Sequence, residues 1–287
     1  MTIGIGVLAT ERERFVAGVV PSHLVLVADT MGSFGDASSH SRLHKLFRFP
    51  DVGFYAAACG RIDRAAELTQ LIYQNLRTLD SSARTYGACH QRIALSCFIY
   101  KRDRFMLEEL PKAGIAPSLE ELVRVVTPGV DSALLERWQG YNFGCDLIVG
   151  FFDTRGRAHL FCSDATDLTL QNCSYPGFAA VGSGADNAMF WLSYRQHTQG
   201  MGMRRSAYHA YEAKLMAEKS AHVNEHVEVL LASATERWYI STHRKGSDES
   251  APVTLAELAD LYEQYGPRST LDIETMTLEL GKSAGQP

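Results

Sequence analysis

The sequence lacks the features that mark several large classes of protein. No apolar run approaches the roughly 20 residues that a membrane-spanning helix needs, so we expect no membrane partner. The 28 Lys and Arg residues are outnumbered by 33 Asp and Glu residues, for a formal net charge of −5, and we therefore expect no nucleic-acid partner. The opening MTIGIGVLATERER lacks a basic leader and a cleavage site, so a signal peptide is not expected.

Closely spaced cysteine pairs and internal repeats are also missing. The six cysteines are Cys59, Cys89, Cys97, Cys145, Cys162 and Cys173, and no two of them form a CxxC pattern. We expect free thiols in a reducing compartment and predict a cytoplasmic location. Without repeats or low-complexity linkers, the chain is interpreted as a single domain over residues 1–287. Its core would cover about 2–243, with a C-terminal helix and strand, 254–280, as an extension.

The chain is 287 residues long and 46% hydrophobic, which is enough for a large core. Alternating or continuous apolar runs predict strands at 3–8, 24–28, 45–49, 52–58, 145–152, 158–162, 178–181, 227–232, 238–240 and 271–280. Helical spacing predicts helices at 62–79, 185–192, 206–220 and 255–265. In the first of these helices the residues expected to face inward are Ile62, Ala66, Thr69, Ile72, Tyr73, Leu76 and Leu79.

Turn and cap signals order these elements. A turn at Pro50–Asp51 predicts that the strands on either side of it form a hairpin. Segment 87–140 is less informative, because 93–100 fits either a strand or a buried helix. The pairs Ser118 with Glu121 and Thr254 with Glu257 match the capping-box pattern and predict helix starts. The order of strands and helices predicts an α+β fold with two antiparallel sheets and helices outside them.

The stretch from Leu24 to Lys45 organises the rest of the chain. Five apolar residues, Leu24 to Ala28, predict a strand buried on both faces, and Asp29 stands where it ends. After a turn-rich segment, Lys45 begins the next apolar run, so the carboxylate and the lysine can meet if the two strands pair. From these two residues alone, a surface ion pair is the simplest interpretation. Thr2 favours another, because it becomes the first residue once Met1 is removed.

Five short motifs in order resemble the landmarks of the proteasome subunit family. They are Thr2 to Gly6, Val27 to Thr30, Lys45–Leu46, Cys59 to Asp63 and Gly182 to Gly184. The spacing from Asp29 to Lys45 matches the family without a gap. Thr2 directly before the first strand resembles the bacterial proteasome-like proteins, including the Anbu type. The resemblance covers roughly residues 2–240.

The resemblance implies a four-layer αββα sandwich, the fold of the N-terminal-nucleophile hydrolases, assembled into a ring or a related oligomer. It also implies a threonine-type peptidase that acts on peptides or unfolded proteins and needs neither cofactor nor metal. An ATPase partner stays undetermined. The implied catalytic residues are Thr2, Asp29, Lys45 and Ser183, with Gly60 in the oxyanion hole.

These residue types suit the implied chemistry. An α-amino group titrates near ~7.7–8.0, so an N-terminal Thr2 carries its own base for its hydroxyl. Lys45 would depress the pKa of that amine, and Asp29 would hold and neutralise Lys45. Backbone N–H groups at Gly60 would bind the oxyanion, because glycine allows close approach. Ser183, at a strand-to-helix turn, would orient the amine.

A non-catalytic subunit of the same fold is the alternative. Where the family has a supporting aspartate and serine, the ungapped alignment has Ser220 and Val223. Those substitutions would remove part of the hydrogen-bond shell around the amino group. A retained Met1 would also leave no free threonine amine.

The segment His222 to His226 is also an HxxEH sequence, the pattern of inverted zinc metallopeptidases. Two histidines four residues apart bind one zinc ion only on a helix. Here the motif runs into the apolar segment 227–231, which predicts a strand. Along a strand, His222 and His226 would lie about 13 Å apart, so we expect no zinc.

Overall fold

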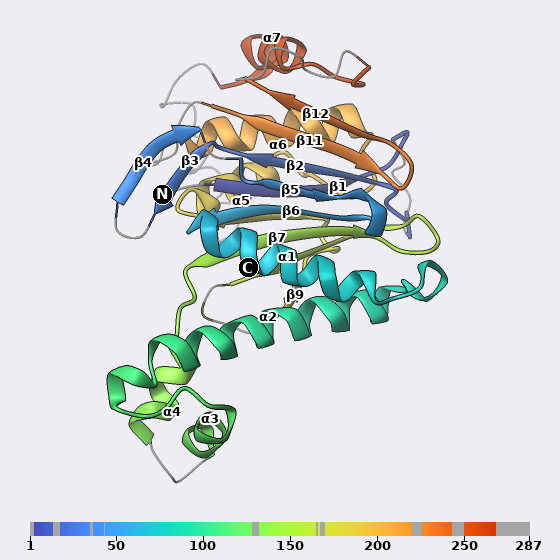
Figure 1. The fold of residues 1–287 in the computed structure, drawn as a ribbon. Helices are drawn as coiled ribbons and strands as arrows, with labels where there is room; N and C mark the ends of the chain where they lie inside the picture. The colour runs from blue at the N-terminus through green and yellow to red at the C-terminus, as the bar shows by residue number, and fades with distance from the viewer. Residues whose placement is uncertain are drawn as a thin grey trace, which may run out of the picture.

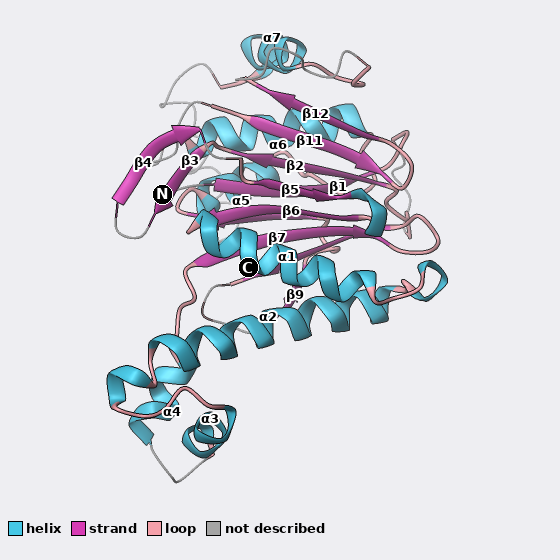
Figure 2. Ribbon diagram, viewed as in Figure 1, coloured by secondary structure: helices cyan, strands magenta, loops and turns pink. Residues whose placement is uncertain are grey.

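The computed structural model describes residues 3–13, 18–34, 37–42, 44–127, 132–164, 166, 170–219, 226–242 and 250–267. Within these residues the chain has a mixed α+β fold with two five-stranded antiparallel sheets, a separate two-stranded sheet and seven α-helices (Figure 1; Figure 2). The predicted α+β class and the two antiparallel sheets are therefore confirmed. The strand predicted at 271–280 lies outside the described residues.

The first sheet contains the two strands that open the chain. Its strand order is β10 (Phe178–Gly182), β1 (Ile3–Ala9), β2 (His23–Ala28), β11 (Glu228–Ser233) and β12 (Arg237–Ser241). Every residue of β1 and β2 is buried, as the continuous apolar run in β2 predicts. The predicted pairings of β1 with β2 and of β11 with β12 are both present.

The second sheet is built from the middle of the chain. Its strand order is β5 (Leu46–Phe49), β6 (Phe54–Gly60), β7 (Cys145–Phe152), β8 (Ala158–Ser163) and β9 (Leu170–Asn172). The predicted turn between β5 and β6 is a short 3₁₀ segment, Pro50–Val52. The short edge strand β9 was not predicted, because three residues give too brief a pattern to recognise.

The two sheets pack face to face through apolar side chains. Those from the first sheet include Leu8, Leu24, Leu26 and Leu230, and those from the second include Tyr55, Ala57, Ile148 and Leu160. Two glycines allow the close approach. A Cβ on Gly6 would lie 2.6 Å from a methyl group of Ile148, and one on Gly150 would lie 2.1 Å from a methyl group of Leu24.

Helices pack on the outer face of each sheet (Figure 1). On the second sheet, α1 (Ile62–Arg77) packs against β6 and β7, and α2 (Tyr86–Glu108) packs against α1. On the first sheet, α5 (Ala185–Tyr194) and α6 (Met203–Ala217) cover β1, β2 and β10, and α7 (Leu255–Tyr265) packs against α6. The short helices α3 (Leu119–Val126) and α4 (Ser132–Gln139) follow α2 and contact each other.

Several helix predictions can be compared with these elements. The ambiguous run 93–100 belongs to α2 and is helical. Ser118 and Thr254 cap α3 and α7 as predicted, and the capping box between Thr254 and Glu257 is complete. In α1 the predicted inward position Ala66 is exposed, whereas Ala65 is buried. The buried stripe of α1 therefore includes Ala65 and Leu68, which the predicted spacing omits, in addition to Thr69, Ile72 and Leu76.

The sequence predicts no strand in the turn-rich segment after Asp29, but the structure has a hairpin there. Strand β3 (Met31–Phe34) pairs with β4 (Ala37–Arg42) in a sheet of its own. Figure 1 shows this hairpin projecting past one end of the two large sheets. Among the described residues, every helix is too short or too polar to cross a membrane.

Candidate active site

Two of the predicted site residues, Asp29 and Ser183, follow strands of the first sheet that end beside the start of β1. The first described residue of β1, Ile3, pairs with Gly182, the last residue of β10, and the next residue, Gly4, pairs with Ala28, the last of β2. In antiparallel sheets the start of one strand lies beside the ends of its neighbours. Asp29 and Ser183, which follow β2 and β10, therefore lie at the end where the chain enters β1.

Lys45 reaches this end from the second sheet. It directly precedes β5, and its Nζ lies 2.5 Å from Oδ1 of Asp29. The exposed fractions of the two side chains are 1% for Lys45 and 0% for Asp29. The interpretation as a surface ion pair is therefore wrong. Strands β2 and β5 do not pair with each other, because they belong to different sheets. The Asp29–Lys45 ion pair instead joins the two ends of the segment that contains the β3–β4 hairpin.

Asp29 also holds the start of β1. Its Oδ1 accepts the backbone N–H of Ile3 at 3.0 Å, and the Asp29 N–H donates to the Ile3 carbonyl at 3.3 Å. Thr2 lies outside the described residues. In the sequence it directly precedes Ile3, the residue whose backbone N–H the Asp29 carboxylate accepts.

Burial and nearby charge act on Lys45 in opposite directions. Desolvation lowers the pKa of its ammonium group below the usual range, and this is the larger effect. The charge of Asp29, the Cys59 side chain, the Asp29 hydrogen bond and the charge of Glu228 all raise it. The lysine is thus desolvated as expected, and the negative groups around it favour its charged form.

Gly60 ends β6 at the same end of the second sheet. Its φ is +85°, and a Cβ there would lie 2.4 Å from the carbonyl oxygen of Gly144, so this position requires glycine. The preceding residue, Cys59, donates its thiol to the Val181 carbonyl at 3.1 Å. This contact joins the end of β6 to β10. Its acceptor, Val181, lies one residue before Gly182 and two residues before Ser183. Ser183 itself is exposed in the turn that leads to α5.

Three residues of this region were not identified from the sequence. Glu228, the first residue of β11, is 1% exposed, and its carboxylate contacts His44, the backbone N–H of Lys45 and the Tyr239 hydroxyl. One signal was available, since Glu228 is a charged residue inside the apolar run of a buried strand. Nothing in the local sequence pointed to His44 or Tyr239.

Of the HxxEH sequence, His222 to Glu225 lie outside the described residues. The same holds for Ser220 and Val223, the positions where the chain departs from the family pattern. Within the described residues, no group of three or more His, Cys, Asp or Glu side chains could hold a metal ion. All six cysteines are free thiols, as expected.

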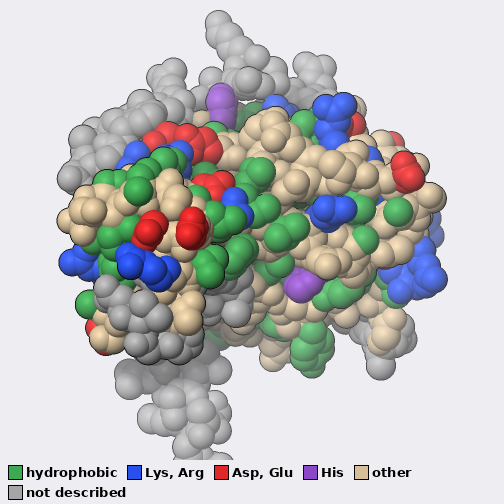
Figure 3. Space-filling model, turned by 60° about the horizontal axis from the view of Figure 1, so that its bottom comes forward, with side chains coloured by type: hydrophobic (Ala, Val, Ile, Leu, Met, Phe, Trp, Pro, Cys, Tyr) green, Lys and Arg blue, Asp and Glu red, His purple; other side chains and the backbone are tan. Residues whose placement is uncertain are grey.

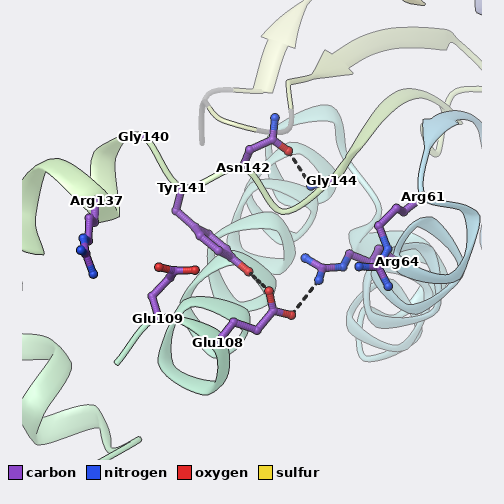
Figure 4. Close-up of a pocket in the computed structure, with 9 residues that line it drawn as sticks. All are labelled: Arg61, Arg64, Glu108, Glu109, Arg137, Gly140, Tyr141, Asn142 and Gly144. Atoms are coloured by element: carbon purple, nitrogen blue, oxygen red, sulfur yellow. Dashed lines mark hydrogen bonds and ion pairs between the residues drawn. The ribbon is translucent and has the colours of Figure 1, made fainter. Parts of the chain in front are cut away.

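A pocket of about 490 Å³ lies elsewhere, between the start of α1, the end of α2 and the segment before β7 (Figure 4). Its lining does not include Asp29, Lys45 or Glu228. Inside it, Arg64 donates to Glu108 at 2.8 Å, and Tyr141 donates to the same carboxylate at 2.8 Å. This pocket is separate from the Asp29–Lys45 region, and none of its lining residues except Arg61 belongs to the five motifs.

Comparison of the chain with protein-family models and with curated proteins found no match. The motifs and the geometry around Asp29 and Lys45 are therefore the features that point to a function.

Proposed function

We propose that the chain is a proteasome-like N-terminal threonine hydrolase that cleaves peptide bonds. One observation carries the proposal: a single buried oxygen of Asp29 accepts both the Lys45 ammonium, at 2.5 Å, and the backbone N–H of Ile3, at 3.0 Å. A buried charge pair is costly, and it is retained where its position serves a purpose. Here the Asp29–Lys45 pair lies beside Ile3, the residue that follows Thr2 in the sequence.

In the proposed reaction, removal of Met1 frees the Thr2 amine. The amine takes the hydroxyl proton, directly or through a water molecule, while the Thr2 oxygen attacks the peptide carbonyl. The tetrahedral intermediate expels the amine half of the peptide, which leaves with that proton, and an ester forms on Thr2. Water then hydrolyses the ester, releases the acid half of the peptide and regenerates the hydroxyl.

Lys45 acts in this proposal as a buried positive charge. It lowers the pKa of the Thr2 amine, which then accepts a proton more readily near neutral pH, and it favours the deprotonated nucleophile. Asp29 keeps the ammonium in place and compensates its burial. The oxyanion hole would be at Gly60, whose conformation allows close approach of a substrate carbonyl. Ser183 would orient the Thr2 amine.

We also propose that the fold is the four-layer αββα sandwich of the N-terminal-nucleophile hydrolases. Two features support it: the core between the two antiparallel sheets, and the helices packed on the outer face of each. The order of the strands places the start of β1 inside the first sheet, between β10 and β2. That arrangement suits a nucleophile at the chain's first residue.

The test is turnover of fluorogenic peptides by the purified full chain and its variants. Thr2→Ala and Lys45→Ala should each lower activity by about a thousandfold or more, because the nucleophile or the charge that activates it is lost. Thr2→Ser should keep measurable activity. Intact-mass measurement should show that Met1 has been removed.

Lys101→Ala is the matched control. Lys101 is also buried, at 2% exposure, but it lies in α2, where its Nζ donates to the Thr166 carbonyl at 2.6 Å. It should lose stability but retain turnover per folded molecule. A folded Thr2→Ala protein with wild-type turnover would rule out the proposed mechanism. A wild-type protein without Met1 and without activity would favour a non-catalytic subunit, and activity abolished by a chelator would favour a metallopeptidase.

A further inference from the structure

We propose that Glu228 is a positioning residue of the same site, one that fixes Lys45 from its backbone side while Asp29 fixes the ammonium. The catalytic part of this inference rests on the proposed function. The contacts of Glu228 with His44, Lys45 and Tyr239 do not depend on that function. Glu228 belongs to none of the motifs that suggested the family.

The two carboxylates that hold Lys45 come from neighbouring strands. Glu228 pairs in register with Ala28, the residue before Asp29, so the two acidic residues stand at adjacent strand ends of the first sheet. Lys45 belongs to the other sheet. Asp29 binds its Nζ at 2.5 Å, and Oε2 of Glu228 accepts its backbone N–H at 3.3 Å. The lysine is thus bound at both ends by one sheet.

The Glu228 carboxylate is itself held by two further side chains. Its Oε1 lies 2.5 Å from Nδ1 of His44 and accepts a short hydrogen bond from the Tyr239 hydroxyl. Tyr239 comes from β12, the neighbour of β11, whereas His44 directly precedes Lys45. A carboxylate that is 1% exposed is stable only when its oxygens are bonded, and here both are.

The location of these contacts indicates a role beyond filling the interior. His44 and Lys45 are the residues through which the chain first enters the second sheet, after the β3–β4 hairpin. Glu228 binds both of them and therefore determines where the Lys45 side chain starts. Its negative charge also favours the Lys45 ammonium, in the same direction as Asp29 and Cys59. Loss of the Glu228 charge should lower the pKa of the Lys45 ammonium group. Loss of the hydrogen bond to the Lys45 backbone N–H should let the lysine shift from its position.

The experiment compares Glu228→Gln with Glu236→Gln, using the full chain. Both variants remove one negative charge from the β11–β12 hairpin, but Glu236 is exposed in the turn at the opposite end. With lysine labelled at Cε, NMR follows the titration of Lys45. Its signal is assigned as the one that is missing from the spectrum of Lys45→Arg. We expect the midpoint to fall by roughly half to one and a half pH units in Glu228→Gln and to stay unchanged in Glu236→Gln.

Peptide turnover supplies the second readout. A shift of Lys45 away from its position should lower kcat by about 10- to 100-fold with little change in KM, because in the proposed mechanism the lysine acts on the nucleophile and not on substrate binding. If the wild type proves inactive but Glu228→Gln still lowers the Lys45 midpoint, the proposed function fails and the positioning role stands. If turnover is normal and the midpoint does not move, the positioning role is overturned.

Tyr239→Phe keeps the test decisive if Glu228→Gln does not fold. It retains the carboxylate and removes one of the two groups that contact Oε1, leaving His44 in place. The less constrained carboxylate should hold the Lys45 backbone N–H less well, so amide exchange at Lys45 should become about two- to tenfold faster, the equivalent of one hydrogen bond. Unchanged exchange at Lys45 in this variant would overturn the inference.

Discussion

His197 and His209 form a buried pair whose charge state should control stability at low pH. Their Nδ1 atoms lie 3.4 Å apart, and their side chains are 2% and 4% exposed. Burial lowers the pKa of His197 to about 4 and that of His209 to about 3, the latter also through the neighbouring imidazole. In the unfolded chain both would titrate near ~6.5, so between these values the unfolded state binds more protons.

We therefore expect the free energy of unfolding to be independent of this pair above about pH 6.5 and to decline as the pH falls towards 4. The decline should be up to ~1.4 kcal/mol per pH unit for each imidazole. Urea unfolding at a series of pH values measures it. His209→Gln should reduce the slope, whereas His90→Gln, on α2, should leave it unchanged. An identical slope in wild type and His209→Gln would contradict the assignment.

At the scale of secondary-structure elements, the spacing between the two sheets depends on Gly150 in β7. A Cβ there would lie 2.1 Å from one methyl group of Leu24 and 3.0 Å from its Cγ. Gly150→Ala should thus destabilise the protein by about 1–3 kcal/mol through overpacking. Denaturant unfolding of the variant measures the loss.

The double variant Gly150→Ala with Leu24→Val gives the control. The shorter valine makes room for the new methyl group, so the two changes should cost less together than the sum of their separate costs. Gly87→Ala is the matched glycine, because a Cβ on Gly87 in α2 meets nothing within 4 Å. It should be neutral or stabilising. Additive costs for the Gly150 and Leu24 changes would show that the sheets are spaced by other contacts.

At the scale of the whole molecule, the helices outside the second sheet carry exposed apolar side chains. Leu107 of α2 is 63% exposed, and Leu119 and Val123 of α3 are 53% and 56% exposed. Figure 3 shows hydrophobic side chains gathered on part of this face, with acidic and basic side chains among them. Groups of this kind mark association surfaces in many soluble proteins, and the proposed function implies an oligomer.

We expect the full chain to sediment well above its monomer mass of 31.7 kDa at micromolar concentration. The variant Leu107→Gln with Val123→Gln should sediment as smaller species, because it removes apolar area from these helices. Arg124→Gln, a change on α3 at an ion pair with Glu121, is the control and should leave assembly intact. Sedimentation of the wild type as a 31.7 kDa monomer alone would contradict an oligomeric assembly.

Elements whose signals are local can be identified from the amino-acid sequence. The apolar run Leu24 to Ala28 identified a buried strand, and Thr254 with Glu257 identified the start of α7, because both patterns depend on neighbours in the chain. Local signals were insufficient at 93–100, where a short apolar run suits strand and helix equally. They were incomplete after Asp29, where glycine and serine indicate turns but no pattern indicates the two strands of the β3–β4 hairpin.

The assembly of the candidate site depends on tertiary packing and cannot be read from the sequence. Asp29 and Lys45 could be predicted to meet, but not that they would do so across two different sheets, fully buried. Glu228 stands 183 residues from Lys45, and no local pattern connects them. Their contact follows from the pairing of β11 with β2 and from the packing of one sheet on the other. Those interactions join segments distant in the chain, so their outcome depends on the packing of the whole core.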